Sequence, residues 1–245
     1  MKILITGSKG FLGKNLIEAL MDYPVDVVEF NSATKKDVLF ETLKDCDFVF
    51  NFAAVHRPNN PDDFYKINVQ LLRDIVECLE ANNNMCPVLY TSSIQAVDNS
   101  DYGRSKLAGE AVLRNHARKM NTRGIIYRLT NIFGKSAKPN SHSVVATFCY
   151  NIQRGMPIII SNPNHLMHFY YIDEVVNDFV QRLFEESNPH DEEPYTLSDE
   201  CIYSTTLSEL ADMLHYFKDC DIKQLLPVLS NKYMKYAYYT YCSYK

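Results

Sequence analysis

The chain opens on Lys2-Ile3-Leu4-Ile5-Thr6-Gly7-Ser8-Lys9-Gly10-Phe11-Leu12-Gly13. A short apolar run leads into glycines spaced by three residues, and Leu12, Leu16 and Leu20 then recur at helical spacing. A strand, a tight glycine turn and a helix N-terminus together are typical of a pyrophosphate site, because backbone can approach the ligand and N–H groups face its charge. The same pattern also fits an ordinary strand-to-helix turn, so the rest of the chain must decide.

The bulk composition is that of a globular protein. A chain of 245 residues fits one large domain or a domain plus a small lobe. A net charge of −5 argues against a general nucleic-acid binder, which usually has an excess of basic residues. No apolar run is long enough to cross a bilayer, and a strand rather than a signal peptide begins the chain, so we expect a cytoplasmic protein without membrane insertion.

The cysteines are odd in number and scattered. Seven cysteines without a C-x-x-C pair predict thiols in a reducing compartment, and neither a disulfide framework nor a zinc site. His165 and His168 are three residues apart, but no convincing third ligand is near them, so we expect no metal.

The first half of the chain alternates strand-like and helix-like segments. Short apolar runs predict strands at 27–30, 48–52, 88–91 and 125–129. Helical spacing predicts helices over 64–79 and 103–119. This alternation is typical of a parallel sheet covered on both faces, with a ligand crevice at the carboxyl ends of its strands.

After Gly134 the pattern changes. Thr206 and Glu209 form a plausible capping box for a helix through Phe217. The other expected elements are a loop at 139–142, a helix at 144–152, strands at 158–160 and 169–172, a helix carrying 175–180 and a surface loop at 187–194. Six of the 17 tyrosines lie within 233–245, which predicts either a tail packed on its own domain or a chain whose next domain is missing.

Tyr102 and Lys106 are the second chemical signal. Four residues apart on a helix, they share one face, so the ammonium can lie near the phenol. A free tyrosine has a pKa near ~10, and a close lysine together with an oxidised nicotinamide would lower it toward neutral pH. The strand before them ends in Thr91-Ser92-Ser93, whose hydroxyls can polarise a substrate carbonyl. A solvated helix face would explain the Tyr–Lys pair alone, but the full set in this order favours a nicotinamide site.

With these motifs the chain resembles the extended short-chain dehydrogenase/reductase family, in its sugar-nucleotide epimerase, dehydratase and reductase group. The matching pieces are Thr6-Gly7-x-x-Gly10-x-x-Gly13, Asn51-Phe52-Ala53-Ala54, Asn68-Val69, Ser92-Ser93, Tyr102-x-x-x-Lys106, Arg128-x-x-Asn131-x-x-Gly134 and Tyr171-Ile172-Asp173-Glu174-Val175-Val176. The resemblance implies an α/β, Rossmann-type doubly wound parallel sheet with a smaller C-terminal substrate-binding lobe, in a homodimer. The NADP(H)-binding domain would comprise 1–134 and a returning segment at about 169–182, and the lobe about 135–168 and 183–245.

The resemblance also implies roles for individual residues. Ser93, Tyr102 and Lys106 would be catalytic. The cofactor residues would be Gly7, Lys9, Gly10, Phe11, Leu12, Asn31, Ser32, Lys35, Phe52, Ala53, Ala54, Asn68, Thr91, Ser92, Tyr102, Lys106 and Leu129. The substrate residues would be Val55, Arg57, Ser93, Ile94, Gln95, Asn131, Lys138, Asn140 and Arg154.

The end of the second strand bears on the choice of cofactor. NAD-using relatives place an acid there to bind the ribose 2′-hydroxyl. Asn31 and Ser32 occupy that position, with Lys35 nearby, so NADP(H) is expected over NAD(H). The alternative is that Glu29, earlier in the strand, reaches the ribose.

The two residues directly after Ser93 bear on the reaction type. Dehydratases of the family carry an acidic pair there, whereas this chain has Ile94-Gln95, which cannot do general acid–base work. Arg57-Pro58, Ser92-Ser93-Ile94-Gln95-Ala96, Lys138-Pro139-Asn140 and the segment 143–150 resemble the bacterial capsular-polysaccharide UDP-sugar reductases of the UDP-N-acetyl-L-fucosamine pathway, which continue into a cupin domain. A cupin domain is expected to be absent from this chain, whose Tyr-rich end falls about where one would begin.

That narrower resemblance implies NADPH-dependent reduction of a UDP-linked 4-keto-6-deoxy-N-acetylhexosamine in capsule or O-antigen polysaccharide biosynthesis. Arg57, Arg128, Arg154 and Lys138 are candidate cations for the diphosphate, unless they are ordinary surface charges. Met167 stands where many relatives carry an arginine, so the diphosphate contacts must differ. The alternatives are a nucleotide-sugar 4-epimerase that retains NAD(P) and, in another class, a non-catalytic NADP(H)-binding regulator.

Overall fold

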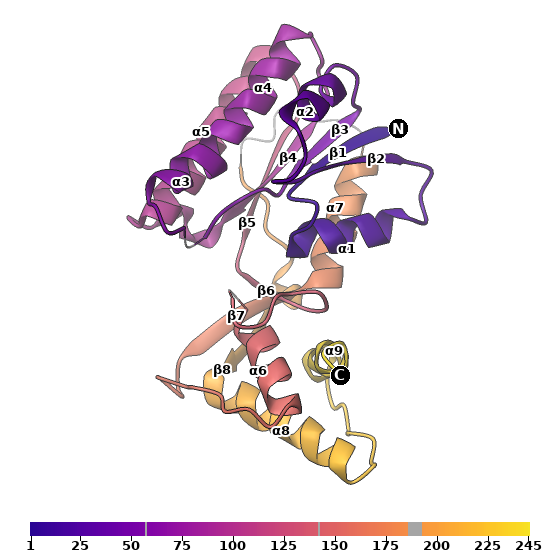
Figure 1. The fold of residues 1–245 in the computed structure, drawn as a ribbon, viewed down its shortest axis with the longest axis vertical. Helices are drawn as coiled ribbons and strands as arrows, with labels where there is room; N and C mark the ends of the chain where they lie inside the picture. Colours follow the sequence, from indigo (N-terminus) through magenta and orange to yellow (C-terminus); the bar gives the residue numbers. More distant parts are fainter. Residues whose placement is uncertain (57, 142, 186–192) are drawn as a thin grey trace. The chain divides into compact units, whose positions relative to one another are not determined.

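The computed structural model describes residues 1–56, 58–141, 143–185 and 193–245 (Figure 1). The chain divides into two compact units. The first comprises Met1–Leu129 and Val176–Thr196, and the second comprises Thr130–Val175 and Leu197–Lys245.

The first unit is built on a parallel sheet. Its strands are β1 (Lys2–Thr6), β2 (Asp26–Phe30), β3 (Phe48–Asn51), β4 (Val88–Ser93) and β5 (Gly124–Leu129). They follow the order β2-β1-β3-β4-β5, so the chain crosses from one side of β1 to the other between β2 and β3. Every residue of β3 and β4 is buried, as the unbroken apolar runs in the sequence predicted. The Rossmann-like fold is confirmed.

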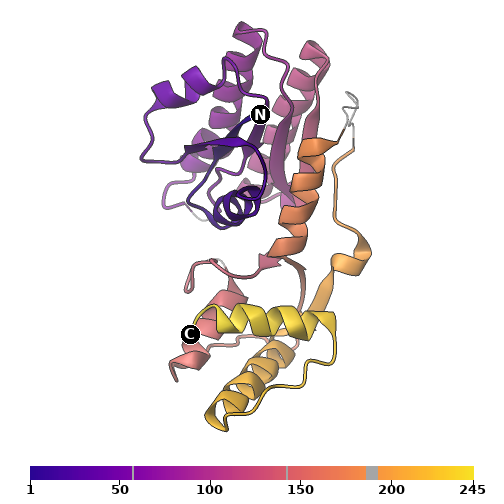
Figure 2. The ribbon, with the colours of Figure 1, turned by 90° about the vertical axis from the view of Figure 1, so that its right-hand side faces the viewer.

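Helices cover both faces of this sheet (Figures 1 and 2). Leu39, Leu79 and Leu113 belong to one buried cluster that includes Leu4 of β1 and Val49 of β3. These leucines come from α2 (Lys36–Thr42), α4 (Leu71–Ala81) and α5 (Asp101–Met120), which therefore cover one face. On the other face α1 (Phe11–Leu20) lies beside the part of α7 (Ile172–Phe184) that belongs to this unit.

Aromatic packing holds α7 to the sheet. The ring of Phe179 lies 5.4 Å from that of Phe52 and 4.9 Å from that of Tyr127, between ring centroids. Aromatic pairs at such distances add to the free energy gained by burying their area. The C-terminal segment of this unit thus completes the sheet's second face.

The helix expected over 64–79 is interrupted. It consists of α3 (Asp62–Tyr65), a π-helical turn η1 (Lys66–Gln70) and α4. Single π-helical turns are rare and frequently lie at functional sites. This one carries the buried Asn68, whose contacts are described below.

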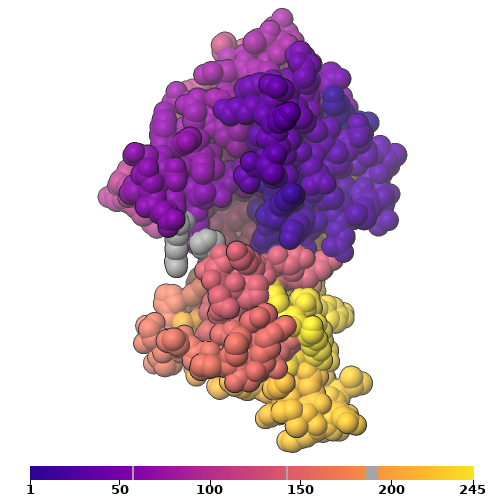
Figure 3. All heavy atoms as spheres, in the orientation of Figure 1, coloured from indigo at the N-terminus to yellow at the C-terminus, as the bar shows by residue number. Residues whose placement is uncertain are grey.

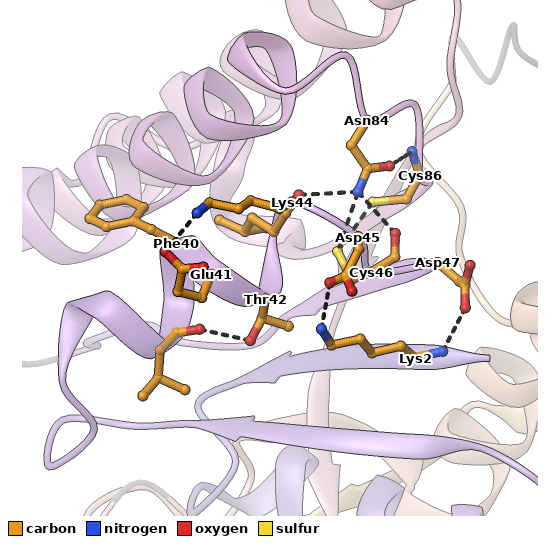
Figure 4. A network of polar contacts seen from close by, with 12 residues as sticks. Lys2, Phe40, Glu41, Thr42, Lys44, Asp45, Cys46, Asp47, Asn84 and Cys86 are labelled. Atoms are coloured by element: carbon orange, nitrogen blue, oxygen red, sulfur yellow. Dashed lines mark hydrogen bonds and ion pairs between the residues drawn. The ribbon is translucent and has the colours of Figure 1, made fainter.

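The amino ends of β3 and β4 are joined by polar contacts (Figure 4). The Asn84 amide donates to the backbone carbonyls of Leu43 and Cys46 at 3.1 and 3.0 Å and accepts from the Cys86 backbone N–H at 3.0 Å. The buried thiols of Cys46 and Cys86 are 3.6 Å apart. These contacts hold together the amino ends of the strands. The glycine turn that follows β1 lies at the other, carboxyl end.

The second unit contains a smaller mixed sheet. β6 (Asn131–Phe133) pairs parallel with β7 (Leu166–Tyr171), and β7 pairs antiparallel with β8 (Tyr203–Thr206). Its helices are α6 (Val144–Gln153), η3 (Asp199–Cys201), α8 (Leu207–Ile222) and α9 (Lys232–Cys242). The predicted capping box is present at the start of α8: Thr206 accepts from the Glu209 backbone N–H, and Glu209 accepts from that of Thr206.

The tyrosine-rich end forms α9 and packs on its own unit. Tyr241 is fully buried, and the Tyr236 ring stacks on Tyr171 of β7 with 3.8 Å between centroids. The Tyr233 ring contacts Tyr203 of β8 in the same way at 5.7 Å. The segment between α8 and α9 is coloured yellow-orange in Figure 3. Its apolar side chains Leu226 and Val228 are exposed.

Some predicted boundaries and elements differ from the structure. The first unit ends at Leu129 rather than at 134, and the returning segment is 176–196 rather than 169–182, because β6 and β7 pair with each other and not with the parallel sheet. The strand expected at 158–160 is wrong: Ile159 is 89% exposed and this run pairs with no described strand. Of the loop expected at 187–194, residues 187–192 lie outside the described part of the chain. No described helix is long and apolar enough to cross a membrane.

Candidate active site

The glycine turn after β1 packs directly on the end of β3. Gly7 has φ +67°, and a Cβ there would lie 2.8 Å from the backbone nitrogen of Ala53. A Cβ on Gly13 would lie 2.5 Å from the Gly7 carbonyl oxygen and 2.7 Å from the Ser8 Cα. Glycine is therefore required at both positions, and the backbone of the turn is left bare at the start of α1.

The N-terminus of α1 can accept an anion. Gly10 precedes the helix, and among the described residues no side chain caps it. The first turn, Phe11-Leu12-Gly13-Lys14, contains no acidic residue. Unpaired N–H groups and the helix dipole both favour negative charge at such an end.

Asn31 follows β2 and faces the glycine turn. Its side-chain nitrogen lies 3.4 Å from the Ser8 hydroxyl, and its side-chain oxygen accepts from the Ala33 backbone at 3.1 Å. Ser32 and Lys35 are exposed beside it, whereas Glu29 is exposed on the edge strand itself. The position after β2 thus presents an amide, a hydroxyl and an ammonium in place of a carboxylate.

The ends of β1, β3 and β4 are joined by side chains. The Thr6 hydroxyl donates to Asn51 and accepts from the Ala53 backbone at 3.2 Å. The Thr91 hydroxyl lies 3.5 Å from the Asn51 carbonyl. These contacts hold the carboxyl edge of the sheet together, which is where ligands bind in open parallel sheets.

Asn68 holds the loop after β3 against α5. Its side-chain oxygen accepts from the Val55 N–H at 2.8 Å, and its nitrogen donates to the Val55 carbonyl at 3.0 Å and the Ser105 hydroxyl at 3.0 Å. Ser105 in turn donates to the Tyr102 carbonyl at 2.7 Å. Asn68 therefore contacts protein atoms with both ends of its amide, between the loop and the helix that carries Tyr102 and Lys106.

Ser93, Tyr102 and Lys106, the predicted catalytic residues, lie near one another at the carboxyl end of β4. The Ser93 hydroxyl accepts from the Gln95 backbone N–H at 3.1 Å and is close enough to the Tyr102 phenol to lower its pKa. Lys106 Nζ donates to the Thr91 carbonyl at 2.8 Å and lies 5.8 Å from the centroid of the Tyr102 ring. Ser100 caps α5 by accepting from the Gly103 N–H at 3.0 Å, which fixes the turn from which Tyr102 extends.

Burial shifts the pKa of Tyr102 and the pKa of Lys106 in opposite directions. Burial raises the pKa of Tyr102, and the hydrogen bond with Ser93 opposes this only in part, so the phenol is protonated at neutral pH. Burial lowers the pKa of Lys106 to about 7, while the negative charge of Glu110 acts in the opposite direction. Lys106 therefore gains or loses its charge near neutral pH, which is typical of lysines in active sites.

Two further aromatic rings border Tyr102. The His56 ring lies 4.4 Å from it and the Phe64 ring 6.2 Å, between centroids. His56 was not among the residues predicted from the sequence, although it lies between the predicted residues Val55 and Arg57. Arg57 itself is outside the described residues.

Ser92 and Arg128 turn toward a buried carboxylate. The Ser92 hydroxyl donates to Glu110 at 2.6 Å, and the Arg128 guanidinium binds the same carboxylate with two bonds of 2.8 Å. Arg128, a candidate cation for the diphosphate, is therefore held by Glu110. Sequence reasoning missed Glu110, although it follows Lys106 by one helical turn on the face that carries Tyr102.

The other predicted cofactor residues surround the same strand ends. Phe52 and Leu129 are buried at the ends of β3 and β5. The half-buried or exposed ones are Lys9, Phe11, Leu12, Ser32, Lys35, Ala53 and Ala54. Ile94 and Gln95 are exposed directly after Ser93.

The predicted substrate residues beyond β5 belong to the second unit. Asn131 donates to the His168 carbonyl at 3.3 Å, and the Asn140 N–H donates to the Thr147 hydroxyl at 2.9 Å. Arg154 lies 3.8 Å from the centroid of the Tyr150 ring and donates to the Tyr244 carbonyl at 3.1 Å. Lys138 is exposed.

The residues of the first unit fit a nicotinamide dinucleotide. The bare glycine turn and the uncapped end of α1 suit a pyrophosphate, and the polar groups after β2 suit a ribose. Tyr102 and Lys106 extend from α5 beside the carboxyl end of β4, where Lys106 binds the Thr91 carbonyl. This agreement comes from the geometry of Gly7 and Gly13, where only hydrogen fits, rather than from the glycine spacing alone.

Comparison with known proteins identifies relatives. The chain is 37% identical over 220 residues to the UDP-2-acetamido-2,6-beta-L-arabino-hexul-4-ose reductase of Pseudomonas aeruginosa. The matched region covers 89% of this chain and 58% of that protein. The capsular polysaccharide assembling protein CapF from Staphylococcus aureus superposes with a TM-score of 0.88 at 36% identity, over 100% of this chain and 66% of that one. The chain thus spans roughly three fifths of the length of these relatives.

More distant structures share the fold. The Thermus thermophilus UDP-glucose 4-epimerase complex with NAD has a TM-score of 0.78 at 14% identity, over 100% of this chain and 99% of that one. A family model described as the NAD dependent epimerase/dehydratase family matches residues 3–196, which include the glycine turn, Ser93, Tyr102 and Lys106. The chain belongs to the NAD dependent epimerase/dehydratase family.

Proposed function

We propose that the protein is an NADPH-dependent reductase of a UDP-linked 4-keto-6-deoxy-N-acetylhexosamine in capsule or O-antigen polysaccharide biosynthesis. The observation that carries this proposal is the Lys106 ammonium, which is held on the Thr91 carbonyl at 2.8 Å and lies 5.8 Å from the centroid of the Tyr102 ring, next to Ser93 at the end of β4. The 37% identity to a protein named as a reductase of a UDP-linked hexulose supports the substrate class.

The proposed chemistry is reduction of the C4 ketone to an alcohol. A bound nicotinamide supplies the hydride. Ser93 donates a hydrogen bond to the ketone oxygen and polarises the carbonyl. Tyr102 gives its phenolic proton to that oxygen as negative charge develops on it. The raised pKa of Tyr102 suits this direction, because the phenol carries its proton at neutral pH.

The proposed role of Lys106 is to stabilise the phenolate that Tyr102 forms when it gives up its proton. Once the phenol has given up its proton, the ammonium of Lys106, which lies 5.8 Å from the centroid of the Tyr102 ring, favours the phenolate in a water-poor site. Lys106 is only 2% exposed, and its bond to the Thr91 carbonyl fixes its direction. We also assign to it contact with the nicotinamide ribose.

We propose NADP(H) as the preferred cofactor. Asn31 removes the carboxylate that would repel a 2′-phosphate, and Ser32 and Lys35 add a donor and a positive charge. The remaining cofactor contacts are those predicted from the sequence at the glycine turn and the ends of β3, β4 and β5. Asn68 contributes by holding Val55 and Ser105.

We further propose that the second unit binds the sugar nucleotide. Its candidate contacts are Asn131, Lys138, Asn140 and Arg154, and those of the first unit are Val55, Ile94, Gln95 and Arg57. Ser93 belongs to both the catalytic and the substrate set. A homodimer in the cytoplasm, where nucleotide sugars are made, completes the proposal. Light scattering of the purified protein and fractionation of cells test these two statements.

The deciding experiment supplies a UDP-linked 4-keto-6-deoxy-N-acetylhexosamine with NADPH and follows absorbance at the nicotinamide band. We expect NADPH to be consumed in proportion to reduced sugar. Interconversion of UDP-sugars without net NADPH consumption would instead indicate a 4-epimerase, and cofactor binding without any turnover a regulator.

Tyr102→Phe tests the assignment of the acid. We expect unchanged cofactor binding and a turnover reduced by about 10²- to 10⁴-fold, the usual contribution of a positioned proton donor. Tyr239→Phe, an exposed tyrosine of α9, is the matched control and should keep full turnover. Full turnover in Tyr102→Phe would remove this residue from the mechanism.

A further inference from the structure

Glu110 is a fully buried carboxylate that the reaction does not consume. Its side chain is 0% exposed on α5, one turn beyond Lys106 and two beyond Tyr102. One oxygen accepts from Ser92 at 2.6 Å and from Arg128 at 2.8 Å. The other accepts from Arg128 at 2.8 Å and from Arg114 at 3.2 Å. Charged carboxylates are seldom fully buried without a partner, and this one is held by several donors.

Strand pairing brings the two main donors to the same carboxylate. Ser92 of β4 and Arg128 of β5 are direct neighbours in the register of the sheet. Both strands end here, and Ser92 stands between Thr91, which binds Lys106, and Ser93, which contacts Tyr102. A carboxylate that fixes Ser92 therefore also restrains the backbone that carries these two contacts.

Glu110 also contributes charge to the surroundings of Lys106. From β4, Lys106 meets the Thr91 carbonyl and the Tyr90 ring, whose centroid is 4.9 Å from Nζ. From α5 it meets the Tyr102 ring and the field of Glu110. The cations Arg128 and Arg114 bind the oxygens of that carboxylate, and the exposed Lys66 is the charged residue of the π-helical turn that packs against α5.

From this arrangement we infer that Glu110 is a positioning residue for the reaction, which keeps the Lys106 ammonium charged and holds the end of β4 in place. The inference rests on the function proposed above. Burial favours the neutral amine of Lys106, and the negative charge of Glu110 opposes it. Glu110 itself is ionised: burial works to raise its pKa, but the hydrogen bonds from Arg128 and Ser92 outweigh burial and hold it below the usual value.

The test compares Glu110→Gln with wild type by two readouts. The first is the titration of Lys106 itself, followed by NMR of lysine labelled at the ε-carbon, with the signal assigned by its loss in Lys106→Met. We expect the Lys106 midpoint to move to lower pH by about 0.5 unit or more in Glu110→Gln, since a nearby opposite charge shifts a pKa by at least that much.

The second readout is the pH profile of turnover. The alkaline limb should move to lower pH by the same amount, which lowers the rate about three- to tenfold above neutral pH and less below it. Glu80→Gln is the matched control, because Glu80 of α4 also binds α5 side chains, His116 and Lys119, but away from Lys106. It should leave both the Lys106 midpoint and the limb unchanged.

Glu110→Gln could fail to fold because it leaves Arg128 without its partner. The double variant Glu110→Gln/Arg128→Gln removes both charges and should shift the Lys106 midpoint in the same direction. Glu110→Asp, which retains the charge, should restore most of the wild-type midpoint.

The outcomes separate the two proposals. An unchanged Lys106 midpoint in Glu110→Gln or in the double variant would overturn the role of Glu110, whatever the enzyme's activity. A shifted midpoint in a protein that does not reduce the keto sugar would support the charge role of Glu110 and reject the proposed function.

Discussion

Gly13→Ala is a prediction in which two physical effects oppose each other. Gly13 lies inside α1, where alanine is favoured over glycine by about 1 kcal/mol in helix propensity. The added Cβ would lie 2.5 Å from the Gly7 carbonyl oxygen, 2.7 Å from the Ser8 Cα and 2.8 Å from the Ser8 carbonyl oxygen. All three are backbone atoms, so no flexible side chain can move aside.

The overlap should decide the sign. Overpacking of a rigid contact costs about 1–3 kcal/mol, so the net effect is a destabilisation of up to about 2 kcal/mol. The shift of α1 also displaces the N–H groups proposed to bind the pyrophosphate. We therefore expect affinity for NADPH to fall by about tenfold or more, because binding geometry at this end tolerates little displacement.

Thermal unfolding and cofactor titration measure both effects. The unfolding midpoint should fall by about 2–4 °C for each kcal/mol lost in a chain of this length, and therefore by up to about 8 °C. Lys14→Ala, on the exposed neighbour in the same helix, is the control and should change stability by less than about 0.5 kcal/mol. A Gly13→Ala protein as stable as wild type, with unchanged NADPH affinity, would refute the close approach of α1 to the glycine turn.

Three further measurements test other parts of the structure. Asn31→Asp should weaken NADPH binding at least about tenfold relative to NADH by adding a negative charge near the 2′-phosphate; a wild-type preference for NADH would overturn the cofactor assignment. Turnover should fall as the pH rises through about 7, because Lys106 is charged below its lowered pKa and neutral above it; a rate that stays flat to pH 9 would contradict this. Asn84→Ala should destabilise the protein by about 1–3 kcal/mol in denaturant unfolding, since it removes the amide that bonds Leu43, Cys46 and Cys86; a change below about 0.5 kcal/mol would show that this sheet edge does not depend on it.

Much of the first unit could be predicted because its signals are local. Unbroken apolar runs indicated the strands of the parallel sheet, and the glycine spacing indicated the turn after β1. Tyr102 and Lys106 share a helix face by spacing alone, and their helix follows closely after the strand that ends at Ser93. In the second unit the capping box was equally local and was confirmed.

The wrong predictions came from local sequence patterns, which do not show which strands pair with one another. The run Ile158-Ile159-Ile160 has strong strand propensity, but propensity cannot supply a partner strand, and Ile159 is exposed. The boundary near 134 was misplaced because β6 looks like a continuation of the first unit, whereas β6 pairs with β7 in the second unit's sheet. The π-helical turn at Asn68 left no mark on the spacing of Phe64, Ile67 and Leu71.

The sequence by itself determined the fold class and indicated the glycine turn, Ser93 and the Tyr102–Lys106 pair as candidates, since each of these signals depends on residues close together in the chain. Only the tertiary structure decided which partners those residues have. Arg128 could be read as a diphosphate ligand until the register of β4 and β5 placed it with Ser92 on Glu110. The low pKa of Lys106 likewise results from burial against Thr91 and Tyr90, and burial depends on how strands and helices pack rather than on their spacing.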